Sequence, residues 1–181
     1  MKFSQIVNYS IRIIIPTACL FLGVWGYVLF ERTIIPWWIP VVAATVFGIF
    51  LSPFLLPLSK MITTSQERWV NIMCSLAMAG TLCYFALLGS NYWLADTGTA
   101  HKEDVTVVEK IKEQHNKYRR SGRGRVISTG EYYYNYFYVV KFSDGTLKKT
   151  PANPKSYHRT RTNSTITLNI QKGALGIDVI R

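Results

Sequence analysis

The sequence predicts an α+β membrane protein, in which three transmembrane helices are followed by a small antiparallel β-barrel or sandwich domain. Three observations predict this fold class. The first hundred residues contain three long apolar runs without charge. The remainder alternates polar and apolar residues with a period of two, which is typical of half-buried strands. Charge divides at the same place, because residues 101–181 hold sixteen Lys and Arg against seven Asp and Glu, a formal charge of +9.

The uncharged runs cover about residues 13–30, 37–59 and 69–88. Even the shortest predicts a helix of about 27 Å, which is enough to cross a hydrocarbon core. Its C-terminal end leads into Glu31 and Arg32 rather than a small-residue cleavage site, so we interpret it as a retained span and not as a signal peptide. Aromatic residues that suit the headgroup layer lie at the ends of the runs. They are Trp37, Trp38, Trp69, Tyr92 and Trp93.

Within the spans, Pro53 and Pro57 are expected to bend or end the second helix. On the third, the small residues Ser75, Ala79 and Cys83 recur every four positions, so another helix, including one from a second chain, can approach there. The three runs contain no Asp, Glu, Lys, Arg or His, the groups that ion paths and proton relays need. We therefore interpret the spans as an anchor or packing surface. A channel or transporter subunit is the alternative that the prolines favour.

Basic residues near the helix ends predict the orientation in the membrane. One side has Lys2, Arg12, Lys60 and Arg68, whereas the other has Arg32 and Lys102. The positive-inside rule then places the N-terminus in the cytoplasm and the C-terminal domain on the opposite side.

The chain is expected to divide into a membrane domain at 1–95, a linker at 96–103 and a soluble basic β domain at 104–181. Residues 132–142 alternate, which predicts a strand whose even-numbered residues are buried and whose odd-numbered Tyr133 and Phe137 are exposed. A second alternation predicts that Ile166, Leu168 and Ile170 face inward, followed after a turn by Leu175, Ile177 and Val179. Gly145 and Gly173 are expected to hold turns that require positive φ.

Two short motifs accompany these strands, namely Phe142-Ser143-Asp144-Gly145 and Lys172-Gly173-Ala174-Leu175-Gly176-Ile177. With the tyrosine-rich strand before them, they resemble a family of small bacterial integral membrane proteins of unknown function that carry a soluble β domain. The resemblance covers roughly residues 104–181 and implies the fold and a bacterial membrane protein. The orientation expected from the basic residues then places the chain in the inner membrane with the C-terminal domain in the periplasm. It implies no activity.

Residues 117–125 contain five basic side chains, which are candidates for binding a partner: Lys117, Arg119, Arg120, Arg123 and Arg125. With the exposed rings of Tyr133 and Phe137 they form the expected partner-binding set, since Arg and Tyr often dominate interface energetics. The segment is either a solvated loop, a surface for an acidic protein, or a contact for anionic lipid. A domain outside the cytoplasm disfavours nucleic acid.

Catalytic and metal-binding patterns are missing from the sequence. No nucleophile motif of the G-x-S-x-G or S-x-x-K kind occurs, and the three histidines have neither partners at metal-ligand spacing nor nearby cysteines. We therefore expect no enzyme activity, cofactor or metal. The expected function is a membrane-anchored protein-binding module, either an immunity protein that neutralises a toxin or an accessory subunit of an envelope complex.

Overall fold

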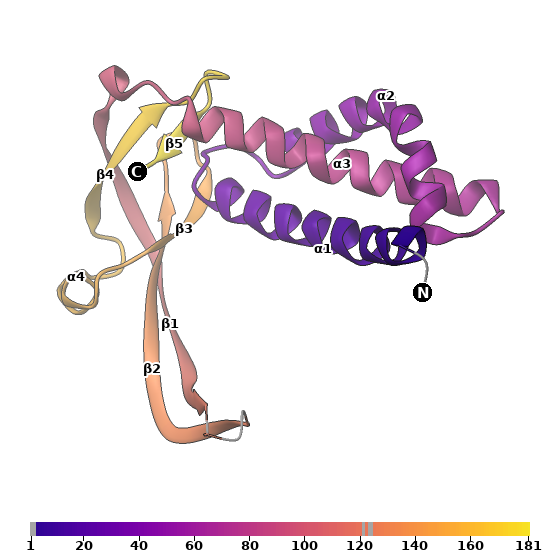
Figure 1. Cartoon of the computed structure of the whole chain (residues 1–181). Helices are drawn as coiled ribbons and strands as arrows, with labels where there is room; N and C mark the ends of the chain where they lie inside the picture. The colour runs from indigo at the N-terminus through magenta and orange to yellow at the C-terminus, as the bar shows by residue number, and fades with distance from the viewer. Residues whose placement is uncertain (1–2, 121, 123–124) are drawn as a thin grey trace. The chain divides into compact units, whose positions relative to one another are not determined.

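The computed structural model describes residues 3–120, 122 and 125–181 (Figure 1). Its helices are α1 (Phe3–Glu31), α2 (Trp38–Thr63), α3 (Arg68–Trp93), the 3-10 helix η1 (Thr97–Thr99) and α4 (Pro154–Arg159). Its strands are β1 (His101–Arg120), β2 (Val126–Lys141), β3 (Leu147–Pro151), β4 (Thr165–Lys172) and β5 (Asp178–Ile180).

The predicted fold class is confirmed in its main features. Three long apolar helices precede a five-stranded antiparallel sheet with the strand order β3-β2-β1-β4-β5. The sheet is open, because β3 and β5 lie at its two edges and do not pair with each other, so it is not a closed barrel. The expected linker at 96–103 contains η1 and the first residues of β1.

Contacts divide the chain into two compact units. The second unit ends earlier than the predicted β domain, which was expected to extend to residue 181. Unit 1 contains residues 1–100 together with 170–181, and unit 2 contains residues 101–169. The last twelve residues group with the helices because they make hydrogen bonds to the helix ends, as described below.

The helices of unit 1 are long and apolar enough to cross a membrane three times, so the chain has the features of a multi-pass membrane protein. They alternate in direction. Near one end of the bundle, the Arg12 guanidinium donates to the carbonyl of Met61 at 2.9 Å. Near the other, Arg32 after α1 donates to the hydroxyl of Tyr92, close to the end of α3, at 2.9 Å.

The close helix approach predicted on the third span occurs within the chain. Ser75 and Ala79 are fully buried, and the Ser75 hydroxyl donates to the carbonyl of Ser52 in α2. At the same contact, a Cβ added to Gly48 would lie 3.1 Å from the backbone nitrogen of Gly80. The side chains of Ser75 and Ala79 are therefore occupied by α2 and are not free to contact a second chain, while Cys83 is half-buried.

Pro53 and Pro57 do not end the second helix, since α2 continues through both to Thr63. Figure 1 shows α2 bent along its length. A proline at position 53 leaves the carbonyl of Ile49 without its usual helical donor. The Ser52 hydroxyl donates to that carbonyl at 3.1 Å. This substitution of a side-chain donor for a missing N–H satisfies the backbone where no water is available.

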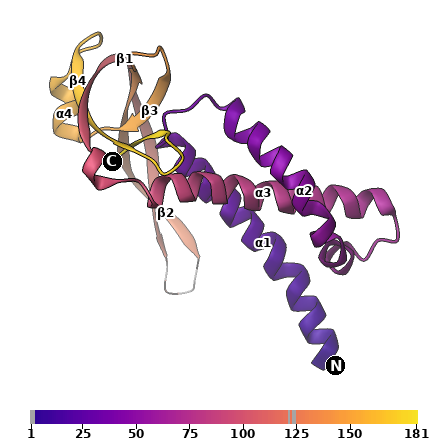
Figure 2. The same ribbon diagram turned by 90° about the horizontal axis from the view of Figure 1, so that it is seen from above.

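Asn91, in the last turn of α3, fixes the C-terminal segment onto the helices. Its side chain is 1% exposed. The amide nitrogen donates to the carbonyl of Ile177 at 3.0 Å, and the amide oxygen accepts from the N–H of Leu175 at 3.0 Å. The backbone carbonyl of Asn91 also accepts from the N–H of Ala174 at 3.3 Å. Figure 2 shows this turn and β5 next to the end of α3.

Gly173 is required at this contact for a reason other than the one predicted. Its φ is not positive; the positive φ in this turn belongs to Gly176, at 76°. A Cβ on Gly173 would lie 2.3 Å from the Asn91 side-chain oxygen, so only glycine fits without displacing that amide. The prediction for Gly145 is confirmed, with φ of 87°.

The segment between α1 and α2 receives the end of β5. The N–H of Ile180 donates to the carbonyl of Arg32 at 2.8 Å, and the N–H of Ile34 donates to the carbonyl of Asp178 at 2.8 Å. Thr33 is fully buried at this short bridge with Val179. The guanidinium of Arg181 lies 4.5 Å from the centroid of the Tyr92 ring.

In unit 2 the predicted alternation on β2 holds for only half of the strand. Tyr138, Val140 and Phe142 are buried, as expected. Tyr132 and Tyr134 are 53% and 41% exposed, contrary to the prediction. They lie beyond the part of this face on which Tyr157 of α4 packs, which is at Tyr136 and Tyr138.

The second predicted alternation is confirmed in β4 and at Val179, which is fully buried in β5, and is wrong at Leu175. Ile166 and Leu168 are less exposed than the Thr and Asn residues between them, and Ile170 is fully buried. Leu175 is 52% exposed, because it lies in the turn that contacts Asn91 rather than in a strand.

We predict that Asn91→Ala and Gly173→Ala both destabilise unit 1. Asn91→Ala leaves the Leu175 N–H without its partner and removes one of the two donors to the Ile177 carbonyl, which also accepts from the N–H of Gly173. This should lower the free energy of unfolding by roughly 1–3 kcal/mol. Unfolding by detergent titration, followed by tryptophan fluorescence, measures this loss. Gly80→Ala is the matched control, because a Cβ there meets no atom within 4 Å. Equal stability of Gly173→Ala and Gly80→Ala would contradict the proposed contact.

Candidate functional site

The candidate site is the long hairpin formed by β1 and β2, here called the ribbon (residues 107–120 with 126–141). Antiparallel pairs run from Thr106–Lys141 to Arg120–Val126. β3 pairs with β2 only over residues 137–141. The distal part of the ribbon is therefore two strands wide, and such a hairpin is marginally stable by itself. Its stability must come from side-chain pairs across the two strands and from the few residues that pack on them.

One face of the ribbon, the tyrosine face, combines even-numbered tyrosines of β2 with lysines of β1. Tyr138 is opposite Lys110, and Tyr136 is opposite Lys112. The ammonium of Lys112 lies 3.9 Å from the centroid of the Tyr134 ring. Cation–π contacts of this kind contribute about 0.5–1 kcal/mol at exposed sites. They hold the lysine charge above β2 rather than leaving it extended into solvent.

The helix α4 covers the proximal end of the tyrosine face. The Tyr157 ring lies 4.7 Å from that of Tyr136 and 5.9 Å from that of Tyr138, centroid to centroid. The Lys110 ammonium lies 4.3 Å from the Tyr157 centroid and donates to the carbonyl of Thr160 at 2.7 Å. α4 begins at Pro154, with the Asn153 side chain accepting from the N–H of Lys155 at 2.9 Å as its N-cap. This cap places Tyr157 on the ribbon.

The other face contains both aromatic rings that the sequence predicted to be exposed. Tyr133 is 45% exposed and stacks on His115, with 5.2 Å between centroids. Phe137 is half-buried, because the ammonium of Lys149 lies 4.0 Å from its centroid. Lys149 also donates to the carboxylate of Glu113. Tyr133 is therefore the more accessible of the two rings, and Phe137 is covered by a lysine.

A bulge in β2 separates the two ends of the ribbon. Between the pairs Asn116–Tyr132 and Tyr118–Ser128 the register shifts, with more residues on β2 than on β1. Gly130 lies in this bulge with φ of 75°, which favours glycine. Figure 1 shows the ribbon bending sharply near its tip. Bulges commonly bend a strand in this way and redirect the side chains beyond them.

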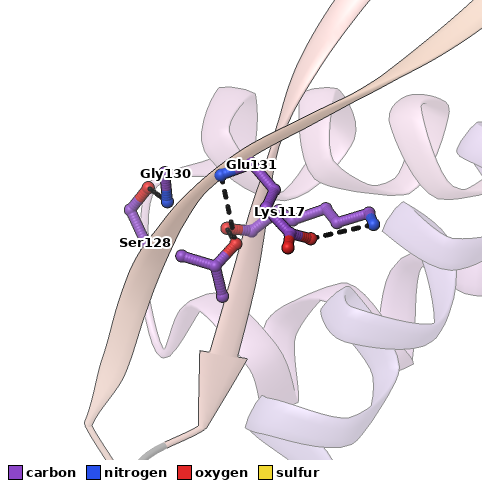
Figure 3. Close-up of polar contacts among 5 residues, drawn as sticks. Lys117, Ser128, Gly130 and Glu131 are labelled. Carbon is purple, nitrogen blue, oxygen red and sulfur yellow. Dashed lines mark hydrogen bonds and ion pairs between the residues drawn. The ribbon is translucent and has the colours of Figure 1, made fainter.

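Polar contacts hold the bulge in place (Figure 3). The Thr129 hydroxyl donates to the carbonyl of Lys117 at 3.0 Å. The Lys117 ammonium lies 3.1 Å from the carboxylate of Glu131, and both side chains are more than half exposed. Lys117, predicted as a partner-binding cation, is thus paired with an acid of the same hairpin. The ion pair between Lys117 and Glu131 therefore joins β1 to β2 at the bulge and stabilises it.

Beyond the bulge, the tip presents the arginines. Arg119, Arg120 and Arg125 are exposed, whereas Arg123 lies outside the described residues. Arg119 and Arg120 line a depression of about 380 Å³ with Gly122 and residues 127–129. Val126 and Ile127 are 63% and 55% exposed at the same place. This combination of guanidinium groups, apolar side chains and two hydroxyls is suited to binding the anionic surface of a partner.

The predicted partner-binding residues do not form one compact cluster. Tyr133 is opposite His115, four residues along β1 from Arg119, which corresponds to about 13 Å in a strand. Phe137 is opposite Ile111, roughly twice as far from Arg119. The structure instead arranges them along a ribbon, with aromatic residues toward its base and arginines at its tip.

Several residues in the ribbon or packed against it were not predicted as part of the site. They are Lys112, His115, Lys149 and Tyr157. Their positions depend on the pairing register and on α4, neither of which the sequence pattern specified. Among the described residues no group of three or more His, Cys, Asp or Glu is placed to hold a metal ion.

Comparisons with protein-family models, with curated proteins and with solved structures found no significant match to the chain.

The pKa of Glu113 should report the contact between β1 and β3. The hydrogen bond from Lys149 lowers this pKa from its ordinary value, with a smaller contribution from His115. Because the folded pKa is lowered, the contact stabilises the fold above the unfolded pKa and is lost as pH falls through the folded value. We predict that Lys149→Met raises the pKa of Glu113, measured by the carboxyl ¹³C shift during an NMR titration.

Lys141→Met is the control for this titration, since Lys141 is exposed on β2 and no ion pair among the described residues includes it. It should leave the Glu113 pKa unchanged. If both variants shift the Glu113 pKa equally, general charge rather than the Lys149 hydrogen bond sets it.

Proposed function

We propose that the protein is a membrane-anchored, non-enzymatic module that binds an acidic protein through the ribbon. The single observation that best supports this is the exposure of tyrosines and arginines on a two-stranded hairpin that α4 and β3 cover only at its base. Tyr and Arg are the residue types that most often anchor protein interfaces. The absence of a nucleophile motif in the sequence supports a binding role.

Charge supports the acidic character of the partner. Residues 101–181 have a formal charge of +9, and the arginines of the tip are exposed. A basic surface of this kind accelerates the encounter with an acidic partner and makes association sensitive to salt. Tyr133, which is accessible and stacked on His115, is the expected slow-dissociating anchor.

The setting that fits this module is a bacterial inner membrane, with the N-terminus in the cytoplasm and unit 2 in the periplasm. The distribution of basic residues at the helix ends and the resemblance to small bacterial membrane proteins with a tyrosine-rich β domain both support it. A small binding module fixed to the membrane suits an immunity protein that neutralises a toxin there. It equally suits an accessory subunit of an envelope complex.

Two alternatives have specific observations in their favour. Exposed Val126 and Ile127 beside Arg119 and Arg120 suit contact with anionic lipid headgroups. Pro53 and Pro57 inside α2 are typical of the broken helices of transporters. In α2, however, the Ser52 hydroxyl already satisfies the carbonyl freed by Pro53, so that carbonyl is not available to coordinate an ion.

Cysteine labelling tests the orientation. Ser156→Cys introduces an exposed thiol in α4, in a background where Cys19, Cys74 and Cys83 are replaced by alanine. We expect an impermeant maleimide to label it in intact spheroplasts. Gln66→Cys, in the loop between α2 and α3, is the matched control and should be labelled only after lysis. The reverse pattern would place unit 2 in the cytoplasm.

Partner capture tests the binding role. The chain is expressed with its genomic neighbours, purified in detergent, and the proteins that remain bound are identified. Replacing Arg119, Arg120 and Arg125 with Ser should reduce recovery of an acidic partner and weaken the dependence of binding on salt. Replacing Lys155, Arg159 and Arg161 with Ser removes the same charge from exposed sites elsewhere in unit 2 and should have a smaller effect.

Recovery of the same partner in equal yield from both triple variants would contradict the proposal. Recovery of anionic lipid alone, lost in the tip variant, would favour the lipid alternative.

A further inference from the structure

The outer edge of β2 is paired over only part of its length. On that side β3 pairs with residues 137–141, and the N–H of Ala152 donates to the carbonyl of Tyr136 at 2.8 Å. Among the described residues no strand pairs with the outer side of β2 from Val126 to Asn135. The sheet edge that β3 occupies therefore continues as an open edge along the ribbon.

The direction of each backbone group along this edge follows from the Tyr136 contact. In an antiparallel ladder, successive residues direct their N–H and C=O groups to opposite sides. Because the Tyr136 carbonyl points outward, the N–H and C=O groups of Tyr132 and Tyr134 also point outward, whereas those of Tyr133 and Asn135 point toward β1. The bulge beyond Tyr132 and the hydrogen bond from Ala152 to Tyr136 limit the regular open edge to residues 132–135.

The open edge lacks the residues that usually protect sheet edges. Proteins block exposed edges with lysine, proline or a covering element. The short edge strand β3 has Lys148, Lys149 and Pro151. Residues 132–135 contain three tyrosines and an asparagine, with no charge and no proline. Tyrosine favours strands, so this segment is suited to accept another strand rather than to repel one.

We propose that an extended acidic segment of the partner adds to this edge as a further strand, in line with β3 and hydrogen-bonded to the outward N–H and C=O groups of Tyr132 and Tyr134. This inference rests on the proposed function and specifies how the partner is bound. In strand addition the main-chain hydrogen bonds supply affinity and the flanking side chains supply specificity.

The position of Lys112 explains why the added strand is acidic. Its ammonium lies over the Tyr134 ring, and so above β2, about one strand spacing from an added neighbour. No ion pair among the described residues includes Lys112. Beyond the bulge, Arg119 and Arg120 add positive charge. A second copy of the chain would bring the same basic side chains to the edge, which disfavours self-pairing.

The test uses the full chain in nanodiscs and a synthetic peptide of alternating Glu and Val, capped at both ends. Amide hydrogen exchange is measured residue by residue. At saturating peptide we expect the amides of Tyr132 and Tyr134 to exchange at least tenfold more slowly. Those of Tyr133 and Asn135, already paired with β1, should change little. Docking through side chains alone does not produce such an alternating pattern.

Two variants and two peptides make the result specific. Tyr134→Pro removes an outward N–H without removing a bond to β1, and should weaken peptide binding at least tenfold. Tyr134→Phe retains that N–H and should bind as the parent does. A peptide with proline at every second position should not protect the amides, and one with Lys in place of Glu should bind more weakly.

Four outcomes would overturn the inference. These are no binding of the Glu–Val peptide, binding without protection of Tyr132 and Tyr134, equal binding of the Lys peptide, and protection of these amides in a dimer of the free chain. If the peptide binds without protecting Tyr132 and Tyr134, and an acidic partner is still captured through the arginines, the proposed function would stand although strand addition would not. Alternating protection without any captured partner would instead support the edge site and count against the proposed function.

Discussion

The ends of α1 and α3 leave backbone carbonyls without partners inside the helices, and the C-terminal segment supplies donors to several of them. The last carbonyls of an α-helix have no partner inside the helix. At the end of α3, the carbonyl of Asn91 accepts from Ala174 and that of Tyr92 accepts from the Arg181 guanidinium at 2.9 Å. After α1, the carbonyl of Arg32 accepts from Ile180. The arrangement of unit 1 depends on this exchange of hydrogen bonds between segments far apart in sequence.

Features governed by local sequence could be predicted. The helical spans follow from uncharged apolar runs, and the inward residues of β4 follow from alternation. The aromatic residues at the helix ends also lie as expected, with Trp38 opening α2 and Trp93 closing α3. In each case the residues that decide the structure are neighbours along the chain.

Features governed by distant contacts could not be predicted. The need for glycine at position 173 comes from the Asn91 side chain, which is 82 residues away in the sequence. The exposure of Tyr132 and Tyr134 depends on where α4 packs, at Tyr136 and Tyr138, which the alternation of β2 does not reveal. In the candidate site, the sequence identified the basic and aromatic residues. The pairing register of β1 and β2 was needed to show that the aromatic residues and the arginines are separated along the ribbon. It was also needed to show that lysines lie above the rings.

The discontinuity of unit 1 has a consequence for biogenesis. Residues 101–169 are synthesised after the three helices and before the segment that completes them. The hairpin unit must therefore leave the ribosome, and reach its own side of the membrane, while the ends of α1 and α3 are still without their partners. Insertion of the three helices and binding of the C-terminal segment to their ends are thus separate events in time. Any delay in the synthesis of residues 101–169 prolongs the state in which the ends of α1 and α3 lack these partners.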